Sequence, residues 1–179
     1  MKTILLLLIL LISAPALALD YTNEFHLKFG GWSKHIDEQE FDYNESHKGS
    51  GLEYFFADHN SRHYFGVGFW YMKDSYNFDA NHIGAIYQYR PNSGYWWLDN
   101  FYPSISMAVA NRGWRNKSGN SYVIEKETRL LYYPSISVNL YDYATVDVMY
   151  AFAINDAMPD HTWFARLGIN LTSIYRNFK

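Results

Sequence analysis

The feature that most constrains this chain is an alternation of apolar with small or polar residues, which recurs along most of its length. In residues 64–72, for example, Phe65, Val67, Phe69 and Tyr71 share one face, and Gly, Trp and Met stand between them. A period of two is typical of β-strands, because successive side chains point to opposite faces. Beyond the first twenty residues, no apolar run is long enough for a transmembrane helix. The pattern therefore predicts an all-β chain.

Eight such segments can be counted. Their apolar faces lie within residues 25–29, 52–56, 65–71, 83–89, 105–109, 136–140, 146–152 and 163–171. Longer polar stretches follow the odd-numbered segments, at 33–43, 74–81, 113–122 and 155–161, and shorter turns follow the second, fourth and sixth, at 58–62, 91–94 and 141–144. Outer-membrane barrels have long external loops and short periplasmic turns. We therefore expect an eight-stranded antiparallel transmembrane β-barrel with up-and-down meander topology.

The first eighteen residues have the layout of a secretory signal peptide. Lys2 supplies a positive start, residues 5–12 form an unbroken apolar run, and Ala16-Leu17-Ala18 is a small-x-small cleavage pattern. Such a run is too short to anchor the chain in a bilayer as a helix. We expect cleavage after Ala18, which leaves residues 19–179 as a single barrel domain. The chain has no Cys, which excludes a lipoprotein anchor and disulfides.

Composition favours a membrane barrel over its soluble alternatives. Aromatic residues make up 20% of the chain, including 17 Tyr, as expected for the aromatic girdles of such barrels. A soluble β-sandwich or a lipocalin-like barrel would carry many charges on its polar face. Here that face is rich in Gly, Ala and Ser, which suit a narrow lumen. The net charge of −3 argues against nucleic acid as a partner. We predict location in a bacterial outer membrane, as a monomer.

The face predicted to point inward changes character along the barrel. Near the periplasmic end it is polar and mixed in charge, with His26, Lys28, Glu53, Asp147 and Arg166, which we expect to pair as a plug. Near the outer end it is small or apolar and includes Trp32. That half would suit a flexible alkyl chain. The predicted acyl-chain pocket consists of Gly68, Trp70, Met72, Gly84, Ala108, Ala110 and Met149.

Groups suited to acyl transfer stand at the outer rim. His35 follows the first strand, and Asp74 and Ser75 follow the third. A base, a carboxylate that orients it and a hydroxyl are what such chemistry needs. His26 and His47 are alternatives for the base.

Several short motifs resemble the lipid A palmitoyltransferases of the outer membrane (PagP). Residues 71–77, Tyr-Met-Lys-Asp-Ser-Tyr-Asn, and residues 84–91, Gly-Ala-Ile-Tyr-Gln-Tyr-Arg-Pro, are similar to that family's third and fourth strands. Tyr43-Asn44-Glu45 resembles the end of its first loop, and residues 131–134, Leu-Tyr-Tyr-Pro, resemble a Pro-bearing strand beside its lateral opening. The resemblance assigns Asp74 and Ser75 two of the family's catalytic roles. We choose His35 for the third. The chain lacks room for the family's N-terminal amphipathic helix.

The resemblance implies movement of a fatty acyl chain from a phospholipid donor to the lipid A part of lipopolysaccharide, without a metal or cofactor. The alternatives are a non-enzymatic barrel with an adhesin, resistance or structural role, and another lipid A editor such as a deacylase. Asp156, Asp160 and His161 fit no standard metal-ligand spacing. Arg112, Arg115 and Lys117 in the third predicted loop are candidates for contacts to lipid phosphates.

Overall fold

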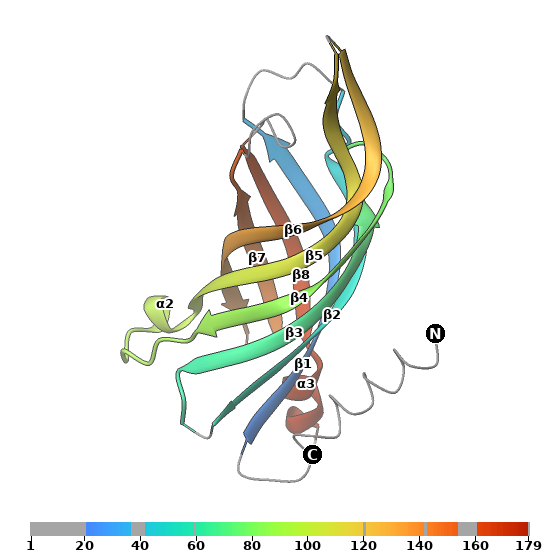
Figure 1. The fold of residues 1–179 in the computed structure, drawn as a ribbon. Helices are drawn as coiled ribbons and strands as arrows, with labels where there is room; N and C mark the ends of the chain where they lie inside the picture. The colour runs from blue at the N-terminus through green and yellow to red at the C-terminus, as the bar shows by residue number, and fades with distance from the viewer. Residues whose placement is uncertain are drawn as a thin grey trace.

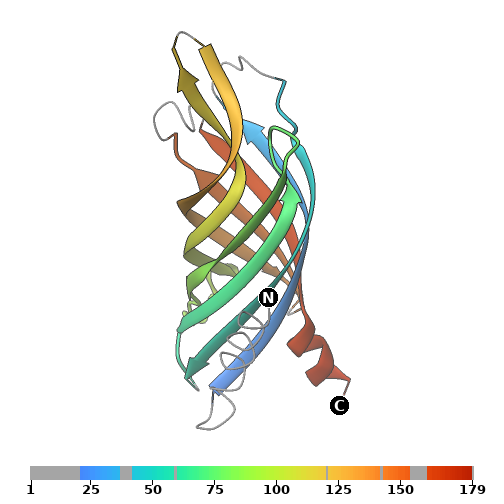
Figure 2. The same cartoon turned by 45° about the vertical axis from the view of Figure 1, so that its right-hand side comes forward.

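The computed structural model describes residues 21–36, 42–58, 60–119, 121–141, 143–153 and 161–178. They form a closed barrel in which each of eight antiparallel strands pairs with the next and β8 pairs with β1 (Figures 1 and 2). The strands are β1 (Tyr21–His35), β2 (Ser46–Asp58), β3 (His63–Lys73), β4 (Asp79–Tyr89), β5 (Phe101–Ser118), β6 (Ser121–Leu140), β7 (Ala144–Ala151) and β8 (Thr162–Asn170). The predicted eight-stranded meander is confirmed. The predicted signal segment lies outside the described residues.

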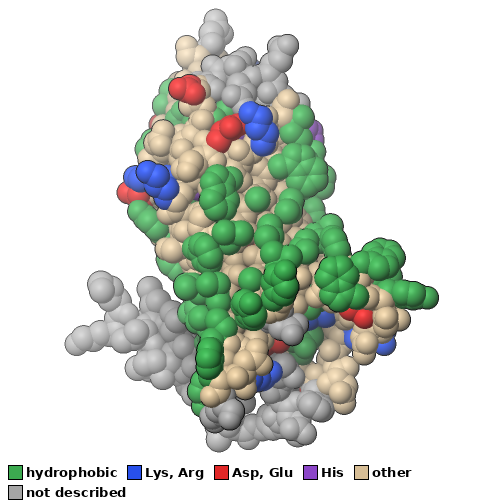
Figure 3. Space-filling model, turned by 180° about the vertical axis from the view of Figure 1, so that it is seen from behind, with side chains coloured by type: hydrophobic (Ala, Val, Ile, Leu, Met, Phe, Trp, Pro, Cys, Tyr) green, Lys and Arg blue, Asp and Glu red, His purple; other side chains and the backbone are tan. Residues whose placement is uncertain are grey.

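The polarity of the barrel is inverted relative to a soluble protein. Leu52, Phe65 and Ile83 are 45–57% exposed on the outer face, whereas Lys28 and Asp147 are each 2% exposed inside. On the face that Figure 3 shows, apolar side chains gather in a broad band across the body, with charged side chains mostly near the ends. An apolar outer band on a closed barrel suits a bilayer, because every strand edge is paired. The protein is an outer-membrane β-barrel, and the soluble alternatives are rejected.

The helices are short. In the described part of the chain, no helix is long and apolar enough to cross a membrane. α2 (Trp96–Asp99) lies in the β4–β5 connection, which is longer than the predicted turn at 91–94. The Asp99 carboxylate accepts hydrogen bonds from the backbone N–H groups of Ser93 and Gly94, and the Ser93 bond lowers the pKa of Asp99. α3 (Leu171–Asn177) follows β8, and Asn170 caps it by accepting from the Ser173 N–H.

The prediction of a third loop at residues 113–122 is wrong, because β5 and β6 continue through this segment as a long hairpin. Their ladder runs to the pair Ser118↔Ser121, beyond the rest of the barrel (Figure 1). Side chains across the ladder explain the extension. The Arg115 guanidinium lies 3.6 Å from the centroid of the Tyr122 ring, a cation–π contact between strands. We call the end with this hairpin the outer end and the end with α3 the periplasmic end, following loop length.

A β-bulge resets the inward face of β1. Gly30 and Gly31 have φ values of 86° and 113°, and the register with both neighbouring strands shifts between Gly30 and Trp32. A one-residue slip moves every following side chain to the other face. Trp32 is therefore 48% exposed on the outer face, and its predicted lumen position is wrong. Ser33 and His35 point inward instead.

The periplasmic half of the lumen is filled by ion pairs. Lys28 Nζ lies 2.8 Å from Asp147 Oδ2 and 3.5 Å from Glu53 Oε2, and Arg166 pairs with both carboxylates. Each of these side chains is at most 11% exposed. Below them, the Glu24 carboxylate bonds to His26, Arg90 and Asn170. Such buried charges are tolerated only when paired. The network closes the barrel and forms the floor of any space above it.

Trp70 fills the middle of the lumen. Its ring lies so close to Gly49 and Gly51 that a Cβ at either would stand 2.3–2.4 Å from ring atoms. The ring N–H donates to Met72 Sδ at 3.1 Å, and the Arg166 guanidinium lies 5.1 Å from the ring centroid. The two glycines on β2 are thus required by the close approach of the indole. Trp70 separates the charged floor from the outer end.

Removing one member of the floor network should destabilise the barrel strongly. We expect Arg166→Leu to cost about 3–5 kcal/mol of unfolding free energy, because Glu53 and Asp147 would then share Lys28 alone. The control is Lys34→Leu, whose partner Glu45 lies 3.1 Å away but whose side chain is 70% exposed, and this should cost less than about 1 kcal/mol. Urea titration of the barrel refolded in detergent measures both. Equal losses of unfolding free energy in the two variants would contradict the prediction that the buried ion pairs hold the lumen together.

Candidate functional site

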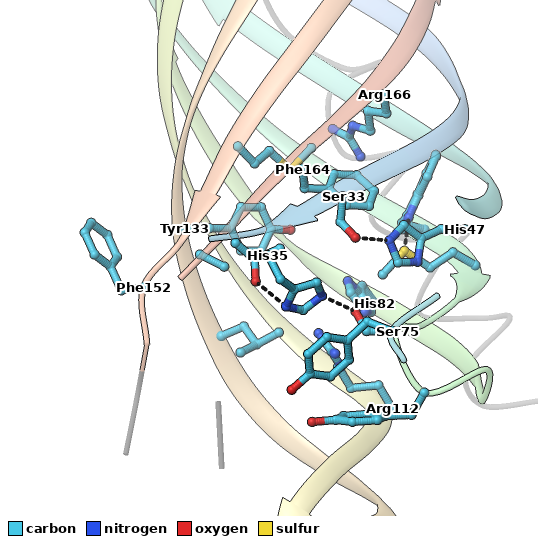
Figure 4. Close-up of a pocket in the computed structure, with 18 of the residues that line it drawn as sticks. Ser33, His35, His47, Ser75, His82, Arg112, Tyr133, Phe152, Phe164 and Arg166 are labelled. Atoms are coloured by element: carbon cyan, nitrogen blue, oxygen red, sulfur yellow. Dashed lines mark hydrogen bonds between the residues drawn. The ribbon is translucent and has the colours of Figure 1, made fainter. Parts of the chain in front are cut away.

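A cavity of about 110 Å³ occupies the outer end of the lumen (Figure 4). Trp70 and Met72 line it from β3, Met149 from β7, and Phe164 and Arg166 from β8. Its upper wall carries Ser33, His35, His47, Ser75 and Thr162. The cavity therefore joins the apolar surface around Trp70 to a cluster of hydroxyl and imidazole groups.

The structure brings two of the predicted catalytic residues into contact. His35 Nε2 lies 3.2 Å from Ser75 Oγ, and His35 Nδ1 lies 3.2 Å from Thr162 Oγ1. The Tyr43 ring stacks on the imidazole with centroids 4.0 Å apart. Asn44 N–H donates to the carbonyl oxygen of Ser75 at 2.9 Å, which fastens the end of the first loop to the β3–β4 turn. His35 and Ser75 form a hydrogen-bonded pair within the range that proton transfer requires.

Asp74 is placed differently from the role that the resemblance implied. Its Oδ1 accepts the N–H groups of Tyr76 and Phe78, each at 2.9 Å, and its Oδ2 accepts the Gly113 N–H at 2.6 Å. The side chain is fully buried. A carboxylate with three backbone donors organises the turn and ties it to β5. In the described residues, the group that contacts the far nitrogen of His35 is the Thr162 hydroxyl.

The two alternative histidines lie in different places. His26 is part of the periplasmic plug, where its Nε2 lies 3.0 Å from Glu24 Oε2, and it does not line the cavity. His47 does line the cavity. Its Nε2 lies 2.8 Å from Ser33 Oγ, and its Nδ1 lies 2.7 Å from the Lys73 carbonyl oxygen. The cavity thus has a second serine–histidine pair.

The predicted acyl-chain pocket is only partly open. Trp70, Met72 and Met149 line the cavity. Gly68, Gly84 and Ala108 line a separate space of about 20 Å³ below it, and Ala110 packs against Trp114 and Leu131. An apolar cavity of about 150 Å³ holds a benzene molecule. The present cavity is therefore of a size for the carbonyl region of an acyl ester with a short length of chain.

The formal charges among the described residues that line the cavity are positive. Arg112 and Arg166 line it, and no Asp or Glu of the described residues is among its lining. Arg166 is paired in the floor network. Arg112, expected in a loop, stands on β5 inside the wall, and its described hydrogen bond is a 3.3 Å contact to the Gly113 carbonyl. The wall therefore favours an anionic or strongly polar ligand.

Sequence reasoning missed Ser33, Thr162 and His82 of this site and misplaced Arg112. Ser33 and Thr162 are adjacent to predicted features but were not singled out, because the bulge that turns Ser33 inward is visible only as Gly30-Gly31. His82 lies on the inward face of β4, and its buried Nε2 has no hydrogen-bond partner among the described residues. Arg112 was assigned to a loop. The alternation of β4 could have identified His82.

The ladder between β6 and β7 ends beside the cavity. Pairing of β6 with β7 ends at Ser135↔Met149, next to Pro134, which has no N–H to donate to a neighbouring strand. Tyr132 and Phe152 lie on the outer face of this seam, 54% and 50% exposed, and both line the cavity. The cavity therefore reaches from the lumen to the surface that faces lipid.

The described residues hold no group of three or more His, Asp or Glu arranged for a metal ion. Asp156 and Asp160 of the fourth predicted loop lie outside the described residues. His161 is described, and its Nδ1 lies 2.9 Å from the Tyr150 hydroxyl.

No family model matches the sequence, and no curated protein does. Solved structures that resemble it include Ail, the attachment invasion locus protein of Yersinia pestis, in complex with the heparin analogue sucrose octasulfate, with 14% identity and a TM-score of 0.49 over 86% of this chain and all of that one. Another is the N-terminal β-barrel domain of Pseudomonas aeruginosa OprF, with 10% identity and a TM-score of 0.46 over 83% of this chain and 97% of that one.

If the Asp74 carboxylate organises the turn, its substitution should lower the stability of the folded barrel. We expect Asp74→Asn to lower the unfolding free energy by about 1.5–3 kcal/mol, because one amide oxygen replaces two carboxylate oxygens that hold three N–H groups. Thr162→Val, which removes a partner of His35, should cost about 1 kcal/mol or less. Urea titration of both variants in detergent tests this. An unchanged stability for Asp74→Asn would refute the structural role.

Proposed function

We propose that this barrel transfers a fatty acyl chain from a phospholipid to lipid A at the outer end of its lumen. The observation that carries the proposal is the hydrogen-bonded pair of His35 and Ser75, set on a cavity that opens to the lipid-facing surface at the β6–β7 seam. An enzyme of this kind needs a base next to a hydroxyl and a lateral path for a membrane lipid. The resemblance of the motifs around Tyr43, Asp74 and Pro134 to the palmitoyltransferases supports the same assignment.

The geometry gives each residue a task. A hydroxyl of the acceptor, bound at Ser75, attacks the carbonyl carbon of the donor ester while its proton passes through Ser75 Oγ to His35 Nε2. The bond between the carbonyl carbon and the glycerol oxygen then breaks, and the leaving oxygen takes the proton from His35. Thr162 and the stacked Tyr43 ring hold the imidazole in place. The atoms balance without a cofactor or metal.

The charge of the cavity supports a lipid substrate with a phosphate group. Arg112 stands in the wall, and no carboxylate of the described residues lines the cavity beside it. A guanidinium in such a place suits a phosphate oxygen of the donor headgroup or of lipid A. The small size of the cavity supports binding of the ester end of the chain, with the remainder of the chain outside, at the seam.

A second candidate is a non-enzymatic outer-membrane barrel with an adhesin, resistance or structural role. Two observations favour it. The Asp74 carboxylate is engaged by backbone donors, and four of the seven predicted pocket residues pack away from the cavity. A deacylase is a variant of the main proposal in which water takes the place of the acceptor hydroxyl.

The test is lipid A analysis. Gram-negative bacterial cells that express the protein should yield lipid A with one added acyl chain, which mass spectrometry detects. Ser75→Ala and His35→Gln should each reduce this product about 100-fold or more, which is the scale of a lost acid–base group. The control is His63→Gln, because His63 is exposed and bonds to Tyr87 far from the cavity.

Three results would contradict the proposal in different ways. Wild-type protein that adds no acyl chain at normal expression would favour the non-enzymatic barrel. A product that survives in Ser75→Ala and His35→Gln would remove these residues from the reaction. Loss of an acyl chain, in place of gain, would identify a deacylase.

A further inference from the structure

The second serine–histidine pair of the cavity is better defined than the first. A carbonyl oxygen carries no hydrogen, so the 2.7 Å contact between His47 Nδ1 and the Lys73 carbonyl requires the proton on Nδ1. In the neutral imidazole, Nε2 then carries a lone pair. The 2.8 Å contact between Nε2 and Ser33 Oγ is therefore one in which the serine hydroxyl donates. This is the arrangement that activates a serine as a nucleophile.

In the pair of His35 and Ser75, the two hydroxyl contacts of the imidazole do not fix which group donates the hydrogen. Both ring nitrogens of His35 face hydroxyl groups, those of Ser75 and Thr162, each at 3.2 Å. A hydroxyl can donate or accept, so these contacts are compatible with either tautomer. The His35 pair can relay a proton in either direction, whereas the His47 pair is set to withdraw one from Ser33.

Three elements hold the second pair in place. The Gly30-Gly31 bulge turns Ser33 inward, and His47 is 1% exposed, with its ring 5.3 Å from that of Phe164. The Lys73 carbonyl lies at the end of β3, directly before the turn that Asp74 organises. An oriented base beside a hydroxyl is the general form of a catalytic triad, with a backbone carbonyl here as its third member.

We propose that Ser33 is the nucleophile of this cavity and His47 its base, so that the acyl chain passes through an ester on Ser33. The proposal rests on the proposed function and adds a covalent intermediate to it. Figure 4 shows that both pairs face the same cavity, with Arg112 beyond them. Arg112 in the wall, with no carboxylate of the described residues among the lining, favours the negative charge that develops on the carbonyl oxygen during attack.

The reaction then has two steps. Ser33 Oγ attacks the carbonyl carbon of the donor ester, its proton moves to His47 Nε2, and the leaving glycerol oxygen takes that proton as the old ester bond breaks. An acyl ester of Ser33 and a lysophospholipid result. In the second step the acceptor hydroxyl, positioned by Ser75 and His35, attacks the Ser33 ester and gives up its proton. That proton returns to Ser33 Oγ through His47, and the acyl chain leaves on the acceptor.

The experiment uses a fluorophosphonate probe, which forms a covalent bond with activated serines. The full-length mature chain, folded in detergent, is incubated with an alkyl fluorophosphonate, digested and analysed by tandem mass spectrometry. We expect the adduct on Ser33 of the wild-type protein, a result that needs no variant to fold. His47→Gln should slow labelling about 100-fold or more, since it removes the base. Ser75→Ala should still be labelled.

Ser137→Ala is the matched control. Ser137 is also a buried serine, but its hydroxyl accepts from the Gln88 amide at 3.4 Å and bonds to the Asp147 carboxylate, and its hydrogen bonds in the described part of the chain include no imidazole. This variant should be labelled on Ser33 at the wild-type rate. The heat-induced shift in electrophoretic mobility of folded barrels checks that each variant has folded.

The outcomes separate this proposal from the proposed function. An adduct on Ser75 in place of Ser33 would overturn the role of Ser33 and leave acyl transfer standing. No serine adduct in a protein that still acylates lipid A would overturn the covalent intermediate and leave direct transfer. An adduct on Ser33 in a protein that adds no acyl chain to lipid A would support the nucleophile and remove the transferase.

Discussion

The closed hydrogen-bond ladder is the constraint on which the rest of this molecule depends. Once eight strands pair in a ring, each side chain faces either lipid or lumen, and the period of two decides which. Only a bulge can change that assignment within a strand. The one at Gly30-Gly31 does so in β1, and it places Ser33 and His35 inside where unbroken alternation would have put Trp32. The candidate site exists because of this single slip in register.

The lumen below the site is closed by charge pairing. Lys28, Glu53, Asp147 and Arg166 are buried together, and each has an oppositely charged neighbour. Their desolvation is costly, so a well-packed apolar core would serve stability equally well. What the network provides is a rigid floor. Trp70 lies across that floor through its contact with Arg166, and the cavity of about 110 Å³ lies beyond it at the outer end. The position of the cavity is thus a consequence of the plug.

Much of this could be predicted from the sequence, because strand periodicity and membrane polarity are local patterns. The meander and the outward apolar band follow from strand parity and loop order, whereas the contact between His35 and Ser75 also needs the bulge at Gly30-Gly31. The exceptions have physical reasons. The tip of the β5–β6 hairpin looks like a polar loop because it lies beyond the apolar band, yet cross-strand contacts such as Arg115 with Tyr122 keep it paired. Trp70 fills the lumen against Gly49 and Gly51, a fit that parity alone does not reveal.

The placement of Asp74 differs from the one that the sequence resemblance implies. The sequence places a carboxylate directly before Ser75, as the palmitoyltransferase motif does, and the structure uses it to hold the N–H groups of Tyr76, Phe78 and Gly113. That turn fixes two things at once. It presents Ser75 to His35, and it fixes the end of β3, where the Lys73 carbonyl orients His47. Asp74 therefore acts on both serine–histidine pairs through the backbone, so its substitution would disturb the site without Asp74 taking part in proton transfer.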